Sequence, residues 1–469
     1  MEALIIIVFV VGYLAITLEH SIKIDKLIPA LVMMAISWAL ISLGIDSFTQ
    51  WFNSEEHGLV EGFAGFASEG KMELMENTLL HHLGKTAEIL VFLLGAMTIV
   101  EIIDYFDGFS TIKGFIKTKS KVRILWIFSI LAFILSAIID NLTATIVLIS
   151  ILQKIVKERN VRLWYAGLII IAANAGGAWS PIGDVTTTML WIGKKVTTGH
   201  LMGYLFLPSF VCMALPSLIA SFLPVFKGNL EEEKTIDDKP KSKFSSTMLY
   251  LGLGGIVSVP IFKMVTHLPP YVGMMLALGV VATFAEIYSS SKFSLTEVGA
   301  GAESEAHAHH SPVHHSLSKI ELPSILFFLG ILLAVAALES LGILFNFAGT
   351  LQETMPMLGT EIEPIQGYES VSDLVVLLLG VASAVIDNVP LVAASLGMFR
   401  EPMDNELWHF IAFSAGTGGS MLIIGSAAGV VAMGMEKIDF FWYLRKISWL
   451  ALIGFLAGSL TFFFTRTLF

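Results

Sequence analysis

A six-residue string that occurs twice places an aspartate and an asparagine inside long apolar runs. SAIIDN occupies residues 136–141, and SAVIDN occupies residues 383–388. A charged side chain at the centre of a bilayer costs about 2.5 kcal/mol or more, even on the mildest insertion scale. Packing alone does not explain why both halves of the chain place the same carboxylate and amide at that depth. The repeat therefore predicts a functional site built from the two Asp-Asn pairs.

The composition around these strings is that of a polytopic membrane protein. Hydrophobic residues make up 55% of the chain and charged residues 14%, with a mean hydropathy of +0.78. Soluble domains have about 45–50% apolar and about 25% charged residues. A net charge of −11 argues against nucleic acid as a partner. The single cysteine, Cys212, lies in an apolar segment, so no disulfide framework is expected.

Charged loops set the expected sides of the membrane, because basic residues in short loops mark the cytoplasm. The apolar start of the chain lacks the basic region of a cleaved signal and predicts a first span at residues 4–18. Spans at 27–44 and 89–105 then flank an acidic loop, at residues 55–76, on the outer side. Continued along the chain, this rule places both termini outside.

The apolar run that carries the first Asp-Asn pair, residues 124–156, is too long for one helix in a hydrocarbon core about 30 Å thick. Basic residues lie at both of its ends, in 113–123 and in 154–162. A re-entrant hairpin puts both basic clusters on the cytoplasmic side, with Asp140 at its tip. Non-helical backbone at that depth is tolerated only inside protein or beside a wet cavity.

A second long segment, residues 163–192, contains Gly, Ser and Pro at its centre and predicts a helix that is broken in mid-membrane. A hydrophilic linker follows at residues 227–244, and the same plan then returns. The second half contains a Ser- and His-rich linker at 289–318, a hairpin at 371–398 and a broken helix at 408–435.

The sequence thus predicts an all-α polytopic membrane protein made of two inverted repeats, residues 1–226 and 245–469. Each repeat has five transmembrane segments, one of them broken, plus a re-entrant helical hairpin. An odd number of crossings inverts the second copy relative to the first. Inverted repeats whose interrupted helices meet near the midplane are the architecture of secondary transporters.

Asp140 and Asp387 are the first candidates for the site of transport. A carboxylate binds either a cation or a proton, since burial disfavours its charged form and a bound cation stabilises that form. This competition predicts exchange of a cation for a proton. Asn141 and Asn388 have carbonyl oxygens, which suit small hard cations, although asparagine also caps helices.

Oxygen-bearing side chains on the broken segments are further candidate ligands. They are Asn174, Ser180, Asp184, Thr186 and Thr187 in the first half, and Thr417, Ser420 and Ser426 in the second. Hydroxyl groups also bond to helix backbones, so the hydroxyl-bearing residues have a structural alternative. Glu101 and Glu339 lie deep enough in their spans to relay protons. A histidine cluster suggests either a metal-binding or pH-sensing site or, as its Ala-, Gly- and Ser-rich surroundings favour, a solvated linker. The cluster comprises His307, His309, His310, His314 and His315.

The two Asp-Asn strings, the NAGGAWSPIGDVTTT stretch at 174–188 and the SAGTGGS segment at 414–420 resemble those of the NhaD-type sodium/proton antiporters. That family belongs to the ion transporter superfamily, beside arsenite, citrate and dicarboxylate carriers. The resemblance covers most of the chain. It implies exchange of Na⁺ or Li⁺ for H⁺ in a bacterial inner membrane, by a homodimer with moving transport domains. It also implies that Na⁺ binds at the two aspartates and that the important polar positions are Asp140, Asn141, Asn174, Asp184, Thr186, Thr187, Ser383, Asp387 and Asn388.

Two other functions compete with this interpretation. An anion carrier of the same architecture is compatible with helix N-termini, which attract anions, but the hairpin tips carry Asp with no Arg or Lys beside it. An intramembrane aspartyl protease needs two carboxylates that share a proton, and duplicated Asp-Asn tips have no role in such an enzyme. The sequence therefore predicts a transporter rather than an enzyme, without a resident cofactor.

Overall fold

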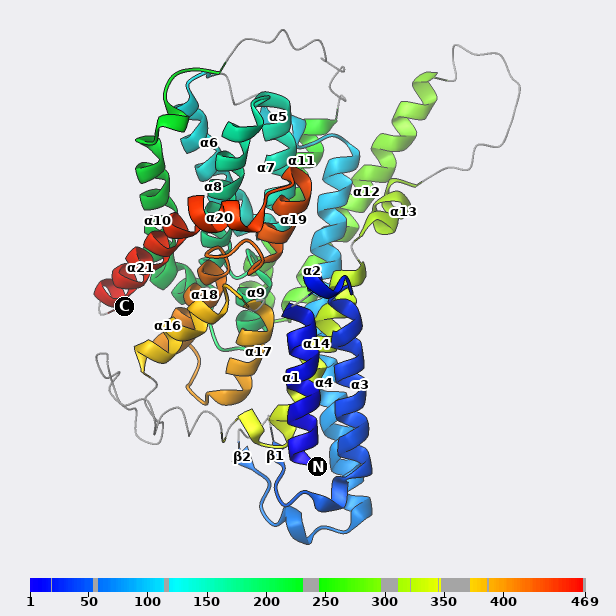
Figure 1. The fold of residues 1–469 in the computed structure, drawn as a ribbon. Coiled ribbons are helices and arrows are strands. Elements are labelled where there is room, and N and C mark those ends of the chain that lie inside the picture. The colour runs from blue at the N-terminus through cyan, green and yellow to red at the C-terminus, as the bar shows by residue number, and fades with distance from the viewer. Residues whose placement is uncertain are drawn as a thin grey trace.

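The computed structural model describes residues 1–17, 19–53, 58–113, 118–230, 244–296, 311–320, 322–344, 346, 372–385 and 388–466. Most of these residues are helical (Figure 1), and the rest form turns, irregular segments and one antiparallel pair, β1 (Phe52–Asn53) with β2 (Gly58–Leu59). Eight helices of the described part are long and apolar enough to cross a membrane. The prediction of an all-α polytopic membrane protein is confirmed.

The helices of the first half end near Ser221, and those of the second half begin at Ser245. The first set is α1 (Glu2–Thr17), α2 (Glu19–Ile22), α3 (Leu27–Leu43), α4 (Ser68–Tyr105), α5 (Ser110–Lys113), α6 (Lys121–Ile139), α7 (Asn141–Ile155), α8 (Arg159–Ala178), α9 (Val185–Ile192) and α10 (Thr198–Ser221). The second set is α11 (Ser245–Thr266), α12 (Pro270–Thr296), α13 (Pro312–Lys319), α14 (Leu322–Ser340), α16 (Asp373–Ala382), α17 (Asn388–Met398), α18 (Glu406–Gly418), α19 (Ala427–Glu436), α20 (Phe440–Lys446) and α21 (Ser448–Thr465).

The acidic segment before the third span differs from its prediction as a loop. From Ser68 onward it is helical and continues without a break into the span, giving the 38-residue α4. The buried Lys71 side chain attaches the first turn of α4 to the preceding residues. The Lys71 ammonium donates to the Phe48 carbonyl at 3.4 Å and lies 4.9 Å from the centre of the Phe63 ring. The helix start therefore packs on the preceding turns.

Part of the predicted Ser- and His-rich linker is also helical. Ser311 accepts a hydrogen bond from the His314 amide and Pro312 occupies the first turn, so α13 begins there. The His315 ring then lies edge-on to Tyr105 of α4, with 5.3 Å between ring centres. The other members of the histidine cluster, His307, His309 and His310, lie outside the described residues.

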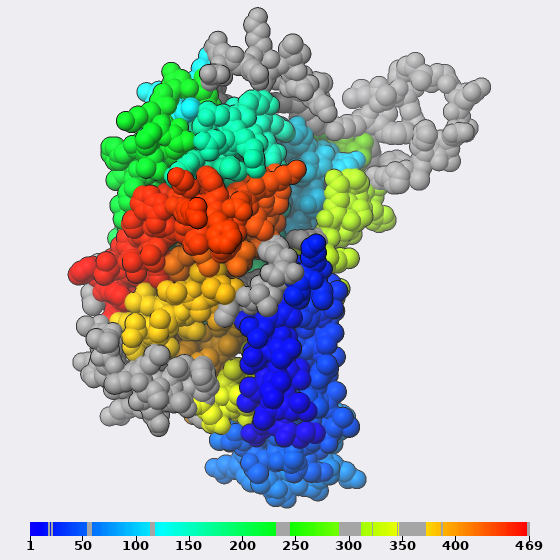
Figure 2. Space-filling model, in the orientation of Figure 1, coloured from blue at the N-terminus to red at the C-terminus, as the bar shows by residue number. Residues whose placement is uncertain are grey.

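Two groups of helices pack mainly within themselves (Figure 1). The scaffold bundle contains α1, α3, α4 and α11 to α14, and the site bundle contains α6 to α10 and α16 to α21. In Figure 2 the blue N-terminal helices stand as a column beside the orange and red helices of the site bundle. The bundles meet where α14 packs on α17, α4 on α9 and α11 on α6.

The most enclosed span is α8, with 89% of its apolar window buried. It contacts α6, α7 and α10 from its own half and α18 and α19 from the other half. Because α8 faces protein rather than lipid, it can carry a polar residue in mid-span without exposing it to hydrocarbon.

The two halves repeat the same close backbone contacts in the site bundle. A methyl group on Gly176 would collide with the Phe133 carbonyl, and one on Gly418 would collide with the Gly380 carbonyl. Each pair occupies matching positions when the two Asp-Asn strings and the two Gly-Gly strings are aligned. The halves therefore share a local packing motif, while the inversion of the second copy stays a prediction.

Gly418→Ala is expected to lower stability by about 2 kcal/mol, because overpacking a tight contact costs about 1–3 kcal/mol. The matched control is Gly254→Ala in α11, where an added methyl group meets no atom within 4 Å. That variant is expected to be neutral or slightly stabilised, since alanine favours helix over glycine. Melting temperatures of the purified proteins in detergent measure both effects. Equal melting temperatures for the two variants would contradict the contact.

Candidate functional site

Asp140 interrupts the apolar run between α6 and α7. Its backbone has φ 78° and ψ 159°, a region that residues with side chains rarely adopt and that costs about 1–3 kcal/mol. The carboxylate accepts hydrogen bonds from the Thr143 amide at 2.8 Å and from the Thr143 hydroxyl at 2.9 Å. Asp140 therefore caps α7 and places a carboxylate at the positive end of that helix.

Asp184 lies at the centre of a buried polar network, with only 2% of its surface exposed. It caps α9 by accepting hydrogen bonds from the Thr186 amide and hydroxyl, both at 3.0 Å. The Asn141 side-chain amide donates to the same carboxylate at 2.7 Å. The Asn388 amide approaches its two oxygens at 3.4 and 3.3 Å. One carboxylate thus bonds to the asparagines of both Asp-Asn pairs.

Asn174 extends this network to the last broken helix. Its side-chain oxygen accepts from the Asn141 amide at 2.9 Å, and its own amide donates to the Ser426 hydroxyl at 3.0 Å. Ser426 in turn accepts from the Gly429 amide and caps α19. We call Asp184, Asn141, Asn174, Thr186, Asn388 and Ser426 the polar network.

Four helices begin at Asp140 or at a residue of the polar network. Asp140 caps α7, Asp184 caps α9, Asn388 is the first residue of α17, and Ser426 caps α19. Helix N-termini carry partial positive charge, so they stabilise carboxylates in the ionised form. Two of these helix starts, those of α7 and α9, place a carboxyl group inside the protein, where a cation and a proton can compete for it.

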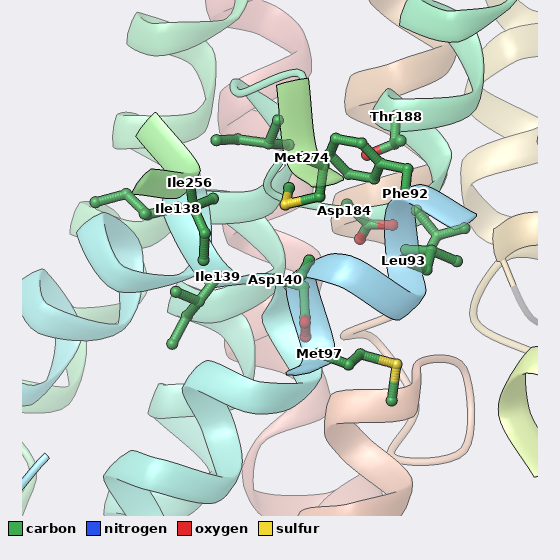
Figure 3. Close-up of a pocket in the computed structure, with 13 residues that line it drawn as sticks. Phe92, Leu93, Met97, Ile138, Ile139, Asp140, Asp184, Thr188, Ile256 and Met274 are labelled. Atoms are coloured by element: carbon green, nitrogen blue, oxygen red, sulfur yellow. The ribbon is translucent and has the colours of Figure 1, made fainter. Parts of the chain in front are cut away.

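Asp140 and Asp184 both line one small cavity of about 20 Å³, room for one water molecule. Figure 3 shows its wall, where Phe92 and Leu93 of α4, Ile256 of α11 and Met274 of α12 face the two carboxylates. The cavity therefore lies between the two bundles. Within the described residues no group of three or more His, Cys, Asp or Glu side chains lies close enough to hold a metal ion.

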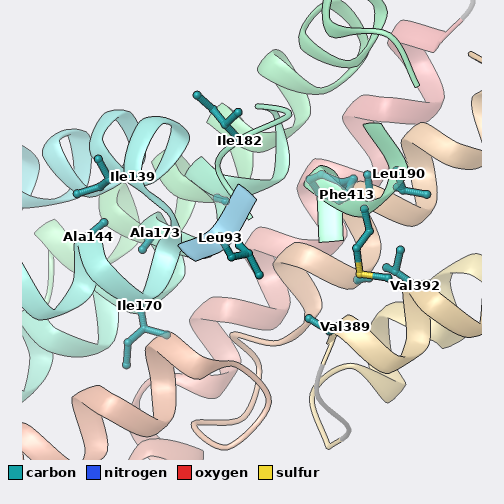
Figure 4. Close-up of a cluster of buried hydrophobic side chains, with 14 of the residues drawn as sticks. Leu93, Ile139, Ala144, Ile170, Ala173, Ile182, Leu190, Val389, Val392 and Phe413 are labelled. Carbon is teal, nitrogen blue, oxygen red and sulfur yellow. The ribbon is translucent and has the colours of Figure 1, made fainter. Parts of the chain in front are cut away.

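Buried apolar side chains surround the network. Figure 4 shows Ile139, Ala173 and Ile182 from the first half and Val389 and Val392 from the second. Three of these residues are direct sequence neighbours of Asp140, Asn174 and Asn388. Such surroundings strengthen every charge interaction inside them, because the local dielectric constant is far below that of water.

Several candidate hydroxyl ligands bond to the protein itself. Ser180 accepts from the Ile182 amide, and the others donate to backbone carbonyls: Thr187 to Asp184, Ser383 to Ala415, Thr417 to Phe413 and Ser420 to Thr417. Ser136 makes the bond that matches that of Ser383, to Ala173 at 2.6 Å. These hydroxyls stabilise the broken helices in the described arrangement.

The structure leaves three candidates without an assigned place in the polar network. Asp387 is outside the described residues. Glu101 is half-buried on α4, four residues (about 6 Å along the helix axis) beyond the cavity-lining Met97. Glu339 of α14 lies against α17, since a methyl group on Gly397 would sit 3.0 Å from its Cγ. Proton relay by Glu101 and Glu339 stays a prediction.

Thr143 is a site residue that the sequence analysis missed. Its amide and hydroxyl hold the Asp140 carboxylate, which keeps a strained backbone in place. The sequence signal was present, because an aspartate at a helix start accepts a hydrogen bond from the backbone amide two or three residues later, and the Thr143 amide lies at that spacing from Asp140. The second copy has Pro390 at the matching position, so that signal is absent there.

Comparisons with known proteins agree with this architecture. Residues 4–403 match a family model described as "Citrate transporter". Sodium/proton antiporter 1 of Arabidopsis thaliana is 41% identical over 96% of this chain and 70% of that protein, and sodium/proton antiporter 2 of the same plant is 37% identical over 97% and 98%. The Na⁺/H⁺ antiporter NhaD of Alkalimonas amylolytica is 30% identical over 97% of this chain and 88% of that protein. The chain therefore belongs to the citrate transporter family and, within it, to the sodium/proton antiporters of the NhaD type.

Proposed function

We propose that this membrane protein exchanges Na⁺ or Li⁺ for H⁺ by alternating access, with the cations competing for Asp184, Asp140 and the adjoining asparagines. One observation carries the proposal. The buried Asp184 carboxylate receives hydrogen bonds from an asparagine of each half, at a point where four helices begin. The sequence similarity to sodium/proton antiporters supports the choice of ions.

The exchange follows from the chemistry of a shared carboxylate. In the described arrangement, the Asn141 and Asn388 amides donate to the Asp184 carboxylate. Na⁺ prefers oxygen, so its arrival requires these amides to turn their carbonyl oxygens inward. A proton on Asp184 removes the charge that holds Na⁺. Since the ionised form binds Na⁺, the apparent KM for Na⁺ is expected to fall as pH rises, by up to about tenfold per pH unit for one competing proton.

Anion transport within the same family is the second candidate, because helix N-termini attract anions. Here those ends already bind carboxylates of the chain, Asp140 on α7 and Asp184 on α9. A dicarboxylate would meet like charge at both. The geometry favours a cation.

The proposed orientation is supported by the charge of the helix ends, and the proposed assembly by the family resemblance. The N-terminus and the β1–β2 pair lie at the lower end of Figure 1, whereas the first turns of α6 lie at the upper end. Those turns carry Lys121 and Arg123, so the positive-inside rule puts the upper end in the cytoplasm. We propose that the protein is a homodimer in a bacterial inner membrane and that each subunit consists of two inverted repeats. Both termini lie in the periplasm in this proposal, and Asp387 provides a second cation site.

Asp140→Asn tests the proposal, because asparagine still caps a helix but carries no charge. Everted vesicles with a pH-sensitive dye report proton movement after addition of Na⁺, Li⁺, K⁺ or citrate. In the wild type, Na⁺ and Li⁺ are expected to drive proton movement. In the variant, the rate of this movement is expected to be at least about tenfold lower, equal to about 1.4 kcal/mol.

The matched control is Asp439→Asn, which changes an exposed aspartate that caps α20 through the Trp442 amide at 2.9 Å. It is expected to exchange at the wild-type rate. Full activity of Asp140→Asn, or proton movement driven by citrate and not by Na⁺, would overturn the assignment.

A further inference from the structure

A lysine of the scaffold bundle holds the C-terminal end of α9. The Lys263 ammonium, on α11, donates to the Trp191 carbonyl at 3.0 Å and lies 4.1 Å from the centre of the Trp191 ring. Trp191 is buried, and Phe92 of α4 meets its ring edge-on at 6.4 Å between centres. Two helices of the scaffold bundle therefore contact one residue of the site bundle, Trp191.

These contacts at Trp191 are connected to the polar network through α9. α9 is only eight residues long, about 12 Å, with Asp184 capping its first turn and Trp191 in its last. The Asp184 carboxylate lies at the positive end of the helix and the Lys263 ammonium at the negative end, so both charges are favourably placed. A displacement of Trp191 relative to α11 displaces the Asp184 carboxylate with it.

The bond also differs in kind from the packing around the cavity. Ile256 of α11 and Met274 of α12 line the cavity with apolar side chains, which can slide without losing a directed bond. The ammonium of Lys263 instead needs the carbonyl and the ring face of one residue together. A shift of the site bundle against the scaffold bundle that exceeds the reach of the flexible lysine side chain breaks this pair of contacts.

We propose that Lys263 and Trp191 form a latch between the bundles, in which Lys263 is a positioning residue that holds α9 and Asp184 in the described state. The latch rests on the proposed function, since alternating access requires the network to open to the two sides in turn. It is closed while the cavity is small, and its release precedes the movement that exposes the network.

Lys71 provides a matched comparison within one bundle. Its ammonium contacts one carbonyl and one aromatic ring, those of Phe48 and Phe63, just as Lys263 does. All three residues precede or begin α4 and belong to the scaffold side. Loss of these contacts affects local packing and leaves the boundary between the bundles intact.

The test measures cavity opening directly with a cysteine reporter. Ala96→Cys, a cavity-lining position on α4, is introduced together with Cys212→Ala, which removes the single native cysteine. The full-length protein in liposomes is treated with a membrane-impermeant maleimide. The parent protein carries only Ala96→Cys and Cys212→Ala. Adding Lys263→Gln to it is expected to raise the labelling rate at least threefold. Adding Lys263→Arg instead is expected to keep the rate within twofold of the parent, and adding Lys71→Gln is expected to leave it unchanged.

The outcomes separate the latch from the proposed function. Labelling of Lys263→Gln at the parent rate, in protein that elutes as one peak, overturns the latch even if Na⁺/H⁺ exchange is intact. If Lys263→Gln does not fold, Trp191→Phe tests the same contact. This variant is expected to be labelled faster than the parent, and labelling at the parent rate overturns the latch. Absence of exchange in the wild type defeats the proposed function through a different measurement.

Discussion

Replacing Asp184 by asparagine is expected to reduce Na⁺-dependent proton movement at least about 100-fold, equal to about 2.8 kcal/mol. The substitution keeps the shape of the side chain and its ability to cap α9. It removes the charge that both Na⁺ and H⁺ require. It also turns an acceptor into a partial donor opposite the Asn141 and Asn388 amides, which loosens the connection between the halves. Initial rates in vesicles at several Na⁺ concentrations measure the effect.

The comparison with Asp140 makes this prediction specific. Asp184 is buried and bonded to both halves, whereas the Asp140 carboxylate accepts its described hydrogen bonds from Thr143 in the first turn of the adjoining helix. The loss is therefore expected to be larger for Asp184→Asn than for Asp140→Asn. Asp184→Glu keeps the charge and is expected to retain more activity than Asp184→Asn. The reverse ranking in either comparison would show that Asp184 is not the central carboxylate.

Arg162→Met is expected to have the largest effect on stability, about 3 kcal/mol. Arg162 of α8 donates from its Nε to both oxygens of Glu436 on α19, at 2.8 and 2.7 Å. The Glu436 side chain has no exposed surface. Removing one partner of a buried ion pair leaves the other charge uncompensated, which costs about 3–5 kcal/mol. Thermal unfolding in detergent is the measurement.

The double variant Arg162→Met with Glu436→Met tests the reason for that loss. With both charges removed, apolar side chains of similar volume fill the site, and such replacements are often neutral. The double variant is expected to lie within about 1 kcal/mol of the wild type. A double variant as unstable as Arg162→Met would show that the other contacts of the arginine, including its hydrogen bonds to the Val156 and Lys157 carbonyls, determine stability here rather than the unpaired glutamate.

The ion pair and the polar network join the same two parts of the chain. Arg162 and Asn174 lie on α8, and their partners Glu436 and Ser426 lie at the end of α19 and at its N-cap. One attachment is at a helix start and the other is deep in the bundle. The first half therefore holds the second at two levels, which keeps the network aligned while the site bundle moves as a unit.

Local sequence was sufficient to predict where the helices break. Asp140 ends one helix and starts the next because an aspartate side chain accepts a hydrogen bond from a backbone amide of the following turn, and Asp184 does the same for α9. The expected loop at residues 55–76 was wrong from Ser68 onward, where the chain is helical and Lys71 contacts a carbonyl and a ring of the preceding turns. Nothing in a window around Lys71 shows those partners.

By itself the sequence determined that the chain is a helical membrane protein, that it carries two Asp-Asn strings in apolar runs, and that it resembles sodium/proton antiporters. These depend on apolar run length, on capping residues and on short motifs, all of which are local. Only the tertiary structure decided that Asp184 is the meeting point of Asn141 and Asn388, which lie 43 and 204 residues away from it. It likewise placed Lys263 on Trp191 across two bundles. Hydrogen bonds between distant residues depend on how whole helices pack, and no local pattern records that packing.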